Sequence, residues 1–247
     1  MKISIITCVL NNSNFIKKSI KSFQKQIYKN KEHIIMDGGS TDGTLKIIER
    51  FKDKNLILST SSDNGIFDAL NKGIKRSSGN IIGILHSDDF YKNNEVLKII
   101  GKTFRNTNAD LIYGDLVYVT KNKPFKRIRS WKAGEYFEKN LQKGWMPPHP
   151  TVFIKKNVFQ KIGKYKTNYK ISSDYDFLIR ALGKKNIKII YIPKILVNMR
   201  IGGKSNNSIK NLFHKSIEDF KIIKKNKIGG LFTLLFKNYS KLSQFLN

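Results

Sequence analysis

The sequence predicts an α/β fold: a Rossmann-like, nucleotide-binding type of mixed sheet flanked by helices, followed by a basic, helical C-terminal region. Two observations support this prediction. As far as about Ile112, short apolar runs that suit buried strands alternate with segments of helical period, the pattern of strands joined by covering helices. Each run also ends in polar residues, and open sheets of this kind bind ligands at those strand ends.

The elements of the first half follow from their apolar patterns. We expect strands at 3–10, 32–37, 56–59 and 81–86. Thr41 is placed to cap the second of the intervening helices. The apolar stripes that predict these helices are Phe15, Ile16, Ile20 and Phe23, then Leu45, Ile48 and Phe51, then Ile66, Leu70 and Ile74.

The second half is less regular. A basic stretch over 121–150, with Trp131 and Trp145, follows the first strand of this half, and long loops of this kind are usually functional or disordered. Gly202 and Gly203 open the C-terminal region. The expected elements are strands at 111–120, 151–156 and 187–193, and a helix from about Ser173.

Composition limits the possible partners. The 247 residues, 40% of them hydrophobic, suffice for a single core. The 47 Lys and Arg against 18 Asp and Glu give a net charge of +29. That charge suits nucleic acid, an anionic membrane or a polyanionic substrate, but a lysine-rich composition without such a role would look the same. The single cysteine, Cys8, excludes an internal disulfide, and we expect it in the core of a protein from a reducing compartment.

No segment has a membrane-spanning pattern. Residues 1–10 could imitate a signal peptide, but their apolar stretch is short and lacks a small-residue cleavage site. No other run approaches the roughly 20 apolar residues that a span needs. We therefore expect a soluble or surface-attached, cytoplasmic protein.

The polar residues at the strand ends are expected to converge. In the stretch DGGSTDGT, Asp37 supplies a carboxylate, Gly39 lets the backbone turn close to a ligand, and Ser40 begins a run of hydroxyls and amides before a helix. A β-turn followed by a helix cap would explain the same residues, and the spacing is not that of a dinucleotide fingerprint or a P-loop. The converging groups are Thr7 with Asn11, then 37–44, 62–65 and 86–89.

The helix after 62–65 places Asp68 beside Asn71 and Lys72. Asp68 and Lys72 form either a helix salt bridge, worth about 0.3–0.5 kcal/mol, or contacts to a sugar or phosphate. The sequence leaves both interpretations open.

Asp88 and Asp89 are adjacent carboxylates directly after a buried run. Two like charges repel unless a cation, a proton or hydrogen-bond donors compensate them. Mg(II) and Mn(II) bind one or two carboxylates together with substrate phosphates. A helix cap would explain one aspartate but not both, so we predict that the pair holds a metal ion that binds an anionic diphosphate.

The predicted helix from Ser173 offers a second acidic group. Ser173 and Asp176 have capping-box-like spacing, and Asp176 can pair with Arg180. This leaves Asp174, at the helix start, as a candidate general base. His149, held between two prolines, is a candidate to orient an acceptor or to reach the metal, although an isolated loop histidine more often does neither.

These motifs together resemble the family 2 glycosyltransferases, inverting enzymes that use nucleotide sugars and have an A-type glycosyltransferase fold. The closest similarity is to small bacterial enzymes that build surface polysaccharides and lipid-linked repeat units. The resemblance covers most of the chain, in SIITCVLNN (4–12), IIMDGGSTDGT (34–44), DNGIFDALNKGI (63–74), ILHSDDFY (84–91), HPTVFIKK (149–156), SSDYDFLIR (172–180) and MRIGGKS (199–205).

The resemblance implies an organisation of the chain. A catalytic domain would span 1–205, with a nucleotide-sugar-binding half at 1–115 and an acceptor-binding half at 116–205, and an amphipathic extension would span 206–247. The Gln-X-X-Arg-Trp motif of processive synthases is absent, which implies a transferase that adds a single sugar. UDP is the commonest donor nucleotide in the family.

The resemblance also implies residue roles. Asp89 would be the more direct ligand of Mn(II) or Mg(II), while Asp88 would lie nearer the ribose; Ser87 stands at the first position of the family's acidic triad. Asp174 would take the proton from the acceptor hydroxyl as it attacks the anomeric carbon. The nucleotide-sugar contacts would be Thr7, Asn11, Asp37, Gly39, Ser40, Asp68, Asn71, Lys72 and Asp88, and the acceptor contacts Trp145, His149 and Asp176.

The C-terminal region fits a glycan or polyprenyl-diphosphate-linked acceptor. Apolar residues of helical period lie beside many lysines, and 231–246 is aromatic, basic and amphipathic. We predict contact with the anionic inner face of the plasma membrane. A helix packed on the core, or a dimer contact, would give the same pattern. The periodic residues are Ile209, Leu212, Phe213, Ile217 and Phe220.

Two other functions compete with sugar transfer. A nucleic-acid-binding module would use the basic charge and aromatics such as Trp131 and Tyr136, but the acids at the strand ends would repel a polyanion in the absence of metal. A metal-dependent nucleotidyltransferase would leave Asp174 and His149 without a role. We therefore expect no nucleic-acid partner; the sequence does not identify the sugar, the acceptor or the oligomeric state.

Overall fold

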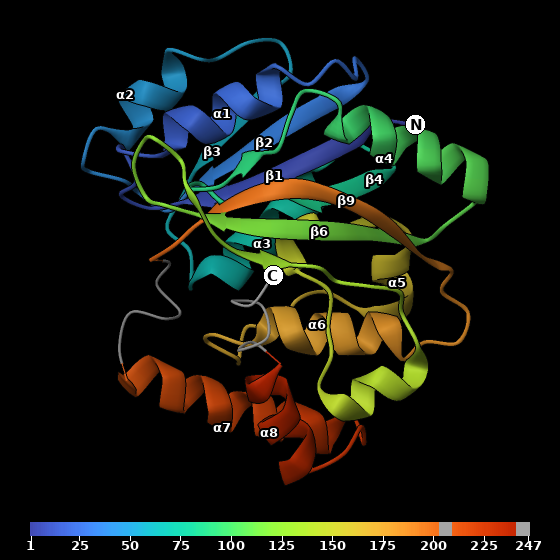
Figure 1. Cartoon of the computed structure of the whole chain (residues 1–247). Coiled ribbons are helices and arrows are strands. Elements are labelled where there is room, and N and C mark those ends of the chain that lie inside the picture. Colours follow the sequence, from blue (N-terminus) through green and yellow to red (C-terminus); the bar gives the residue numbers. More distant parts are fainter. Residues whose placement is uncertain (203–208, 241–247) are drawn as a thin grey trace.

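A nine-stranded mixed sheet runs through the part of the chain that the computed structural model describes, residues 1–202 and 209–240 (Figure 1). The strands are β1 (Ile3–Val9), β2 (Lys31–Asp37), β3 (Leu56–Thr60), β4 (Ile81–Ile84), β5 (Phe90–Tyr91), β6 (Leu111–Val119), β7 (Arg127–Trp131), β8 (Phe153–Lys155) and β9 (Ile189–Arg200).

Helices flank this sheet on both faces (Figure 1). The α-helices are α1 (Ile16–Gln24), α2 (Thr44–Glu49), α3 (Ile66–Arg76), α4 (Val96–Thr107), α5 (Val158–Ile162), α6 (Ser173–Leu182), α7 (Ile209–Lys225) and α8 (Leu231–Tyr239). Two short 3-10 helices, η1 (Glu138–Lys143) and η2 (His149–Thr151), precede β8. Within the described residues, no helix has the length and hydropathy needed to cross a membrane.

The sheet has a parallel part and a mixed part, with the strand order β3-β2-β1-β4-β8-β6-β9-β5. β1 pairs in parallel with β2 and β4, and β2 pairs in parallel with β3. β8 is antiparallel to both β4 and β6, while β6 and β9 are parallel. The parallel strands β1, β2 and β4 therefore end at one edge, as the mixed α/β prediction requires.

The central strand β1 is buried on both faces. Ile5 belongs to the same apolar cluster as Phe23 of α1, whereas its neighbour Ile6 belongs to the cluster that contains Leu70 of α3. Successive side chains of a strand point to opposite faces, so a strand covered by helices on both sides is apolar at consecutive positions. On α3, a Cβ at Gly73 would lie 2.6 Å from Ile6 Cγ2, so only a glycine permits this close helix–strand contact.

Strand β9 is longer than predicted and continues past Pro193 to Arg200. Along β6 the pairing jumps from Ile192 opposite Gly114 to Ile195 opposite Asp115. Pro193 lies in this irregularity, where its missing N–H does not interrupt a ladder hydrogen bond. Because of this extension, Arg200 at the end of β9 lies next to Asp89.

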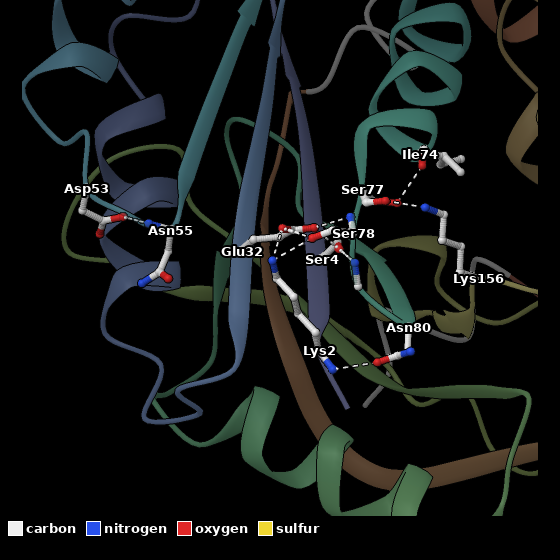
Figure 2. A network of polar contacts seen from close by, with 11 residues as sticks. Lys2, Ser4, Glu32, Asp53, Asn55, Ile74, Ser77, Ser78, Asn80 and Lys156 are labelled. Carbon is white, nitrogen blue, oxygen red and sulfur yellow. Dashed lines mark hydrogen bonds and ion pairs between the residues drawn. The ribbon is translucent and has the colours of Figure 1, made fainter.

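The amino edge of the sheet carries a polar network (Figure 2). Glu32 of β2, which is 3% exposed, accepts hydrogen bonds from Ser4 Oγ of β1 (2.5 Å) and from the backbone N–H of Ser78 (2.7 Å). Lys2 Nζ lies 2.5 Å from the Glu32 carboxylate. The network joins the start of β1 to β2 and to the turn before β4.

The C-terminal helices α7 and α8 lie next to each other, beyond α6 as seen from the sheet (Figure 1). Ile222 and Ile223 of α7 are fully buried in the same apolar cluster as Leu178 of α6. Phe220 is half-buried, whereas Leu212, Phe213 and Ile217 are exposed, so the predicted stripe is not what packs on the core. The side chain of Ile209 is not among those that the structure describes.

Several local predictions are corrected. Helix α2 begins at Thr44, and Asp42 rather than Thr41 accepts the Thr44 N–H (3.0 Å). Leu70 and Ile74 are buried, but Ile66 is 42% exposed because it occupies the first turn of α3 at the edge of the helix–sheet contact. The stretch 121–150 is not wholly irregular, since it contains β7, η1 and the start of η2. Gly203, the 205/206 boundary and residues 241–246 lie outside the described residues.

Candidate functional site

The loops after β1, β2 and β4 are hydrogen-bonded to one another at the carboxyl edge of the sheet. The Asn11 backbone N–H donates to Ser40 Oγ (2.9 Å), and the Thr41 N–H donates to Asn11 Oδ1 (2.8 Å). Asn12 Nδ2 donates to Ser87 Oγ (2.7 Å). These contacts bring together the strand ends that the sequence predicted to converge. They also occupy the side-chain oxygen of Asn11 and the hydroxyl of Ser40 within the loops.

Asp37 ends β2 with one carboxylate oxygen paired and the other unpaired. The side chain is 1% exposed, and Oδ2 accepts the backbone N–H groups of Gly39 and Ser40, both at 3.0 Å. Gly39 has φ = 92°, a left-handed conformation that favours glycine. Oδ1 is buried and has no hydrogen-bond partner within residues 1–202 and 209–240. An N–H or O–H donor of a bound molecule would satisfy this oxygen.

Asp89 presents a second such oxygen after β4. Its side chain is 1% exposed, Oδ1 accepts the Arg200 backbone N–H (3.2 Å), and Oδ2 has no hydrogen-bond partner among the described residues. Burial, followed by the nearby charge of Asp88, raises the pKa of Asp89 well above its ordinary value. The Arg200 guanidinium donates to the Asp88 carbonyl and lies over the rings of Phe15 and Phe90.

The donor set at Asp88 and Asp89 fits a divalent cation. Both residues offer carboxylate oxygens, and the unpaired Asp89 Oδ2 lies in an environment that disfavours a bare negative charge. Within the described residues, no three His, Cys, Asp or Glu side chains form a cluster that could enclose an ion. An ion held here would therefore take much of its coordination from water and substrate oxygens, as Mg(II) and Mn(II) do beside phosphates.

Asp174 lies in the first turn of α6, partly exposed, and its Oδ1 accepts the N–H of Tyr175 (2.8 Å). Burial lowers the pKa of His149 to about 4, with the charge of Asp174 opposing that shift. Burial also raises the pKa of Tyr165, and Asp174 adds to that rise. Asp174 therefore lies near both side chains, and His149 is neutral at pH 7.

His149 links Asp174 to the acidic pair. His149 Nε2 is 2.9 Å from Tyr165 Oη, and its ring centroid is 6.1 Å from that of His86, which lies two residues before Asp88. His149 is 6% exposed and belongs to the helical turn η2 rather than to an open loop. The loop after β4 and the first turn of α6 therefore both lie near His149, which is buried and neutral.

Three residues predicted to contact the substrates have partners within the protein instead; they are Thr7, Asn71 and Asp176. Thr7 is fully buried, donates to the Leu85 carbonyl (2.6 Å) and shares a hydrogen bond with His33 (2.9 Å), so it is inside the sheet rather than at its edge. Both amide atoms of Asn71 bind the backbone of Tyr165 (2.8 and 3.1 Å).

Asp176 is likewise structural. It is fully buried, and its two oxygens pair with Lys166 and Arg180, both at 2.8 Å. This confirms the pairing with Arg180 and leaves no free oxygen for an acceptor. The predicted capping box is wrong, because Ser172 is the N-cap of α6 and makes no side-chain cap bond.

The remaining predicted residues lie at the periphery. Asp68 and Lys72 form the expected helix ion pair (2.9 Å), and Lys72 Nζ also donates to the Ser62 carbonyl (3.1 Å). Trp145 is half-buried, and its indole N–H donates to the Ala133 carbonyl (2.9 Å). These contacts hold Lys72 and Trp145 in place without pointing to a ligand. A pocket of about 860 Å³ lies elsewhere, at the amino edge, and none of the predicted site residues lines it.

Sequence reasoning assigned no individual role to Arg200, Asp63 or Tyr165, although Asp63 lies in the converging segment 62–65 and Arg200 in the stretch MRIGGKS. Arg200 was hidden because the last strand was predicted to end at 193. A Cβ added at Gly38 would lie 3.1 Å from Asp63 Oδ2, so Asp63 also reaches the loop after β2. Burial, followed by the charge of Asp63, raises the pKa of Cys8. Cys8 packs against the core as predicted.

Comparison with known proteins matches the chain to a family model. The model described as "Glycosyl transferase family 2" matches residues 4–165. A curated relative from Mycobacterium bovis, "PGL/p-HBAD biosynthesis glycosyltransferase", is 27% identical over 220 residues, covering 87% of this chain and 83% of its own length.

Solved structures share the fold. TarS 1–349 of S. aureus superposes with a TM-score of 0.71 at 22% identity, over 100% of this chain and 71% of that chain. Its complex with UDP-GlcNAc gives 0.70 at 20% identity, over 100% and 72%. A mannosyltransferase, PcManGT from Pyrobaculum calidifontis, in complex with GDP-Man and Mn2+, gives 0.69 at 14% identity, over 98% and 70%. These neighbours confirm the predicted A-type glycosyltransferase fold.

Proposed function

Because the chain belongs to glycosyl transferase family 2, we propose that it moves one sugar from a nucleoside-diphosphate sugar to an acceptor hydroxyl, with inversion at the anomeric carbon. The observation that carries the proposal is the pair of buried, unpaired oxygens, Asp37 Oδ1 at the end of β2 and Asp89 Oδ2 in the loop after β4; β2 and β4 are the strands that flank β1. The first suits an N–H or O–H donor of a nucleoside. The second, beside Asp88, suits Mn(II) or Mg(II).

The donor is proposed to be a UDP sugar. Support comes from the similar TarS fragment, which was solved with UDP-GlcNAc, and the divalent cation has a parallel in the Mn2+ complex of PcManGT. When bound, a cation held by Asp89 and Asp88 would stabilise negative charge on the departing diphosphate. Gly39, Ser40 and the backbone around Asn11 would form the wall against the nucleoside.

Asp174 is proposed as the general base. Its carboxylate accepts the proton of the acceptor hydroxyl while that oxygen forms a bond to the anomeric carbon. The bond from that carbon to the diphosphate breaks on the opposite face, and its electron pair leaves with the nucleoside diphosphate, so a single displacement inverts the configuration. His149, buried and neutral, and Trp145 form the acceptor side of the site.

The acceptor is proposed to be a glycan or a polyprenyl-diphosphate-linked glycan at the anionic inner face of the plasma membrane. The support lies in α7 and α8, where Phe213 is 67% and Phe232 78% exposed. Residues 209–240 contain seven lysines against Glu218 and Asp219. Exposed aromatic side chains among lysines suit an anionic lipid surface, where each basic residue contributes about 1 kcal/mol.

Donor binding tests the proposed function directly. Thermal shift and calorimetry with UDP, GDP, dTDP and CMP, and with their common sugar conjugates, would be run with Mn(II) and again with EDTA. We expect one nucleotide class to stabilise the protein in a metal-dependent way and Asp89→Ala to abolish that effect. The exposed Glu49→Ala variant is the matched control. Stabilisation of Asp89→Ala equal to wild type would contradict the metal site, and a folded protein that binds no nucleotide would contradict the function.

A further inference from the structure

A carboxylate of α7 holds the backbone that leads into α6. Glu218 Oε1 accepts the N–H of Lys170 (2.7 Å), and Oε2 accepts those of Ile171 (2.9 Å) and Ser172 (2.8 Å). These are three consecutive N–H groups, and they immediately precede the helix whose second residue is Asp174. Ser172, the N-cap, makes no side-chain cap bond, so no local side chain replaces this contact from α7.

A buried ion pair fastens α8 to the same place. Lys237 of α8 is 3% exposed and its Nζ lies 2.6 Å from Asp219 Oδ2, which is on the residue next to Glu218. The same Nζ lies 3.2 Å from the ring centroid of Tyr175. Tyr175 is 1% exposed and follows Asp174 directly in the chain. Helix α8 therefore contacts the first turn of α6 through Lys237 and Tyr175, and Tyr175 is adjacent to the proposed base.

Helix α8 also closes on the acceptor side. Gly144 ends η1 with φ = 70°, and a Cβ there would lie 2.5 Å from Lys237 Cβ and 2.6 Å from the Thr233 carbonyl. This tight contact lies directly before Trp145 and five residues before His149. One pair of helices thus contacts both chain segments that supply the acceptor side of the site.

Resting on the proposed function, we propose that the α7–α8 pair is a brace that fixes Asp174 for proton transfer, and that Glu218 is its principal positioning residue. Glu218 does not touch substrate and acts through the backbone of 170–172. A general base works only when its oxygen lies within hydrogen-bond reach of the proton it removes. A displacement of about 1 Å can cost on the order of 100-fold in rate. Fixing the entry to α6 removes that freedom.

Hydrogen exchange measures the brace without any substrate. In Glu218→Ala, the three N–H groups lose their acceptor, and we expect amide exchange in 170–176 to accelerate about tenfold or more, the loss of roughly one hydrogen bond's worth of protection. Exchange in β1, β2 and β4 should stay at the wild-type rate. Lys224→Ala, an exposed change on the same helix, is the matched control and should leave 170–176 unaltered. Unchanged exchange in Glu218→Ala would overturn the brace.

Turnover separates positioning from general loss of structure. With UDP-GlcNAc, Mn(II) and water as the acceptor, released UDP reports the reaction. We expect Glu218→Ala to lower kcat about 10- to 100-fold with unchanged KM and donor affinity. Glu218→Gln, which keeps one acceptor oxygen, should fall between Glu218→Ala and wild type. An equal effect on kcat and donor affinity would assign Glu218 to the fold as a whole.

A double-mutant cycle completes the test. If Glu218 acts through Asp174, then Glu218→Ala should have little further effect once Asp174 is Asn, because no base remains to be positioned. A full additional loss in the double variant would overturn the positioning role. Failure of the proposed function has a different signature: Asp174→Asn alone would turn over at the wild-type rate, even where exchange in 170–176 responds to Glu218→Ala. That result would remove Glu218 from catalysis and leave it as a structural contact.

Discussion

At the scale of single residues, the candidate site contains two buried carboxylate oxygens without a hydrogen-bond partner among the described residues. Leaving a buried polar atom without a partner costs about 1–3 kcal/mol. Asp37 and Asp89 each leave one such oxygen among the described residues, while other buried carboxylates, such as those of Asp176 and Glu32, are fully paired. A bound donor and cation would recover this cost. Within the described part of the chain, Asp219 also has one unpaired oxygen, but its other oxygen pairs with Lys237 between α7 and α8. An unpaired carboxylate oxygen therefore indicates a candidate ligand contact only where it also lies beyond a strand end, as in Asp37 and Asp89.

The base assignment gives the sharpest prediction at this scale. Asp174→Asn keeps the shape of the side chain but removes its ability to accept a proton. We expect sugar transfer to fall by about 10²- to 10⁴-fold, with donor affinity measured by calorimetry unchanged. Asp53→Asn, on an exposed turn far from α6 in the chain, should transfer at the wild-type rate. Near-normal turnover of Asp174→Asn would mean that another group takes the proton.

The positions of several candidate-site residues could be predicted from sequence because they follow strand ends. Asp37, Asp88 and Asp89 lie where the apolar runs stop, so their position in the fold follows from the pattern. Thr7 and Asn71 could not be interpreted in the same way. Whether a polar side chain faces a ligand or a backbone group from a distant segment depends on tertiary contacts, such as those of Asn71 with Tyr165, 94 positions away.

At the scale of secondary structure elements, β2 is tied into the sheet by a charge. Burial alone would raise the pKa of Glu32, but hydrogen bonds from Lys2, Ser4 and Ser78 outweigh it and lower the pKa to about 2 (Figure 2). The ordinary pKa of this carboxyl group is 4.5. Because folding lowers that pKa, the ionised group stabilises the folded protein at pH values above 4.5. That contribution is lost as the pH falls from about 4.5 toward 2.

Glu32→Gln should reveal this contribution. We expect the free energy of unfolding at pH 7 to be about 2 kcal/mol lower in the variant than in wild type. This is the order of the free energy that corresponds to the pKa shift of Glu32, reduced because the amide keeps some of the hydrogen bonds. The difference should shrink as pH is lowered below 4.5, since wild type then loses the same charge. Urea unfolding at pH 7, 5 and 3 measures it, with the exposed Glu49→Gln as control. A difference that does not vary with pH would show that the carboxylate charge contributes nothing.

Elements with strong periodicity were predictable, and those shaped by pairing were not. The apolar runs of β1, β2 and β4 and the start of α6 lie where the patterns placed them. Strand β9 extends beyond its pattern because β6 offers a partner as far as Val119, and a bulge absorbs Pro193. Strand β7 exists because it pairs with β6, which the basic sequence of 127–131 does not indicate.

At the scale of the whole molecule, charge and exposed apolar surface occur together in the C-terminal helices. The lysines alone would make any attraction to anionic lipid weaken with salt, because surface charges are screened over about 10 Å at 0.1 M ionic strength. The aromatic side chains add a component that salt does not screen. If the proposed membrane contact forms, its affinity should therefore fall with added salt and should also depend on the exposed aromatic side chains.

Vesicle sedimentation tests the proposed membrane contact. We expect binding to phosphatidylglycerol vesicles, weaker binding at 0.5 M than at 0.1 M salt, and little binding to phosphatidylcholine. Phe213→Glu combined with Phe232→Glu should abolish binding, while Ile27→Glu, an exposed apolar site on another part of the surface, should not. Concentration-dependent dimers in light scattering, abolished by the same double variant, would instead assign these side chains to a contact between two copies.

The contact of Glu218 with 170–172 limits how this enzyme can be recombined with its relatives. The family model ends at residue 165, before α6, so the segment from α6 onward could be taken for a unit that can be exchanged between relatives. A chimaera that took α7 from a relative without a carboxylate at position 218 would leave three backbone N–H groups without their acceptor. A chimaera that replaced α6 alone would leave Ile222 and Ile223 facing a mismatched partner. Changes of acceptor specificity should therefore succeed only when both segments come from one parent.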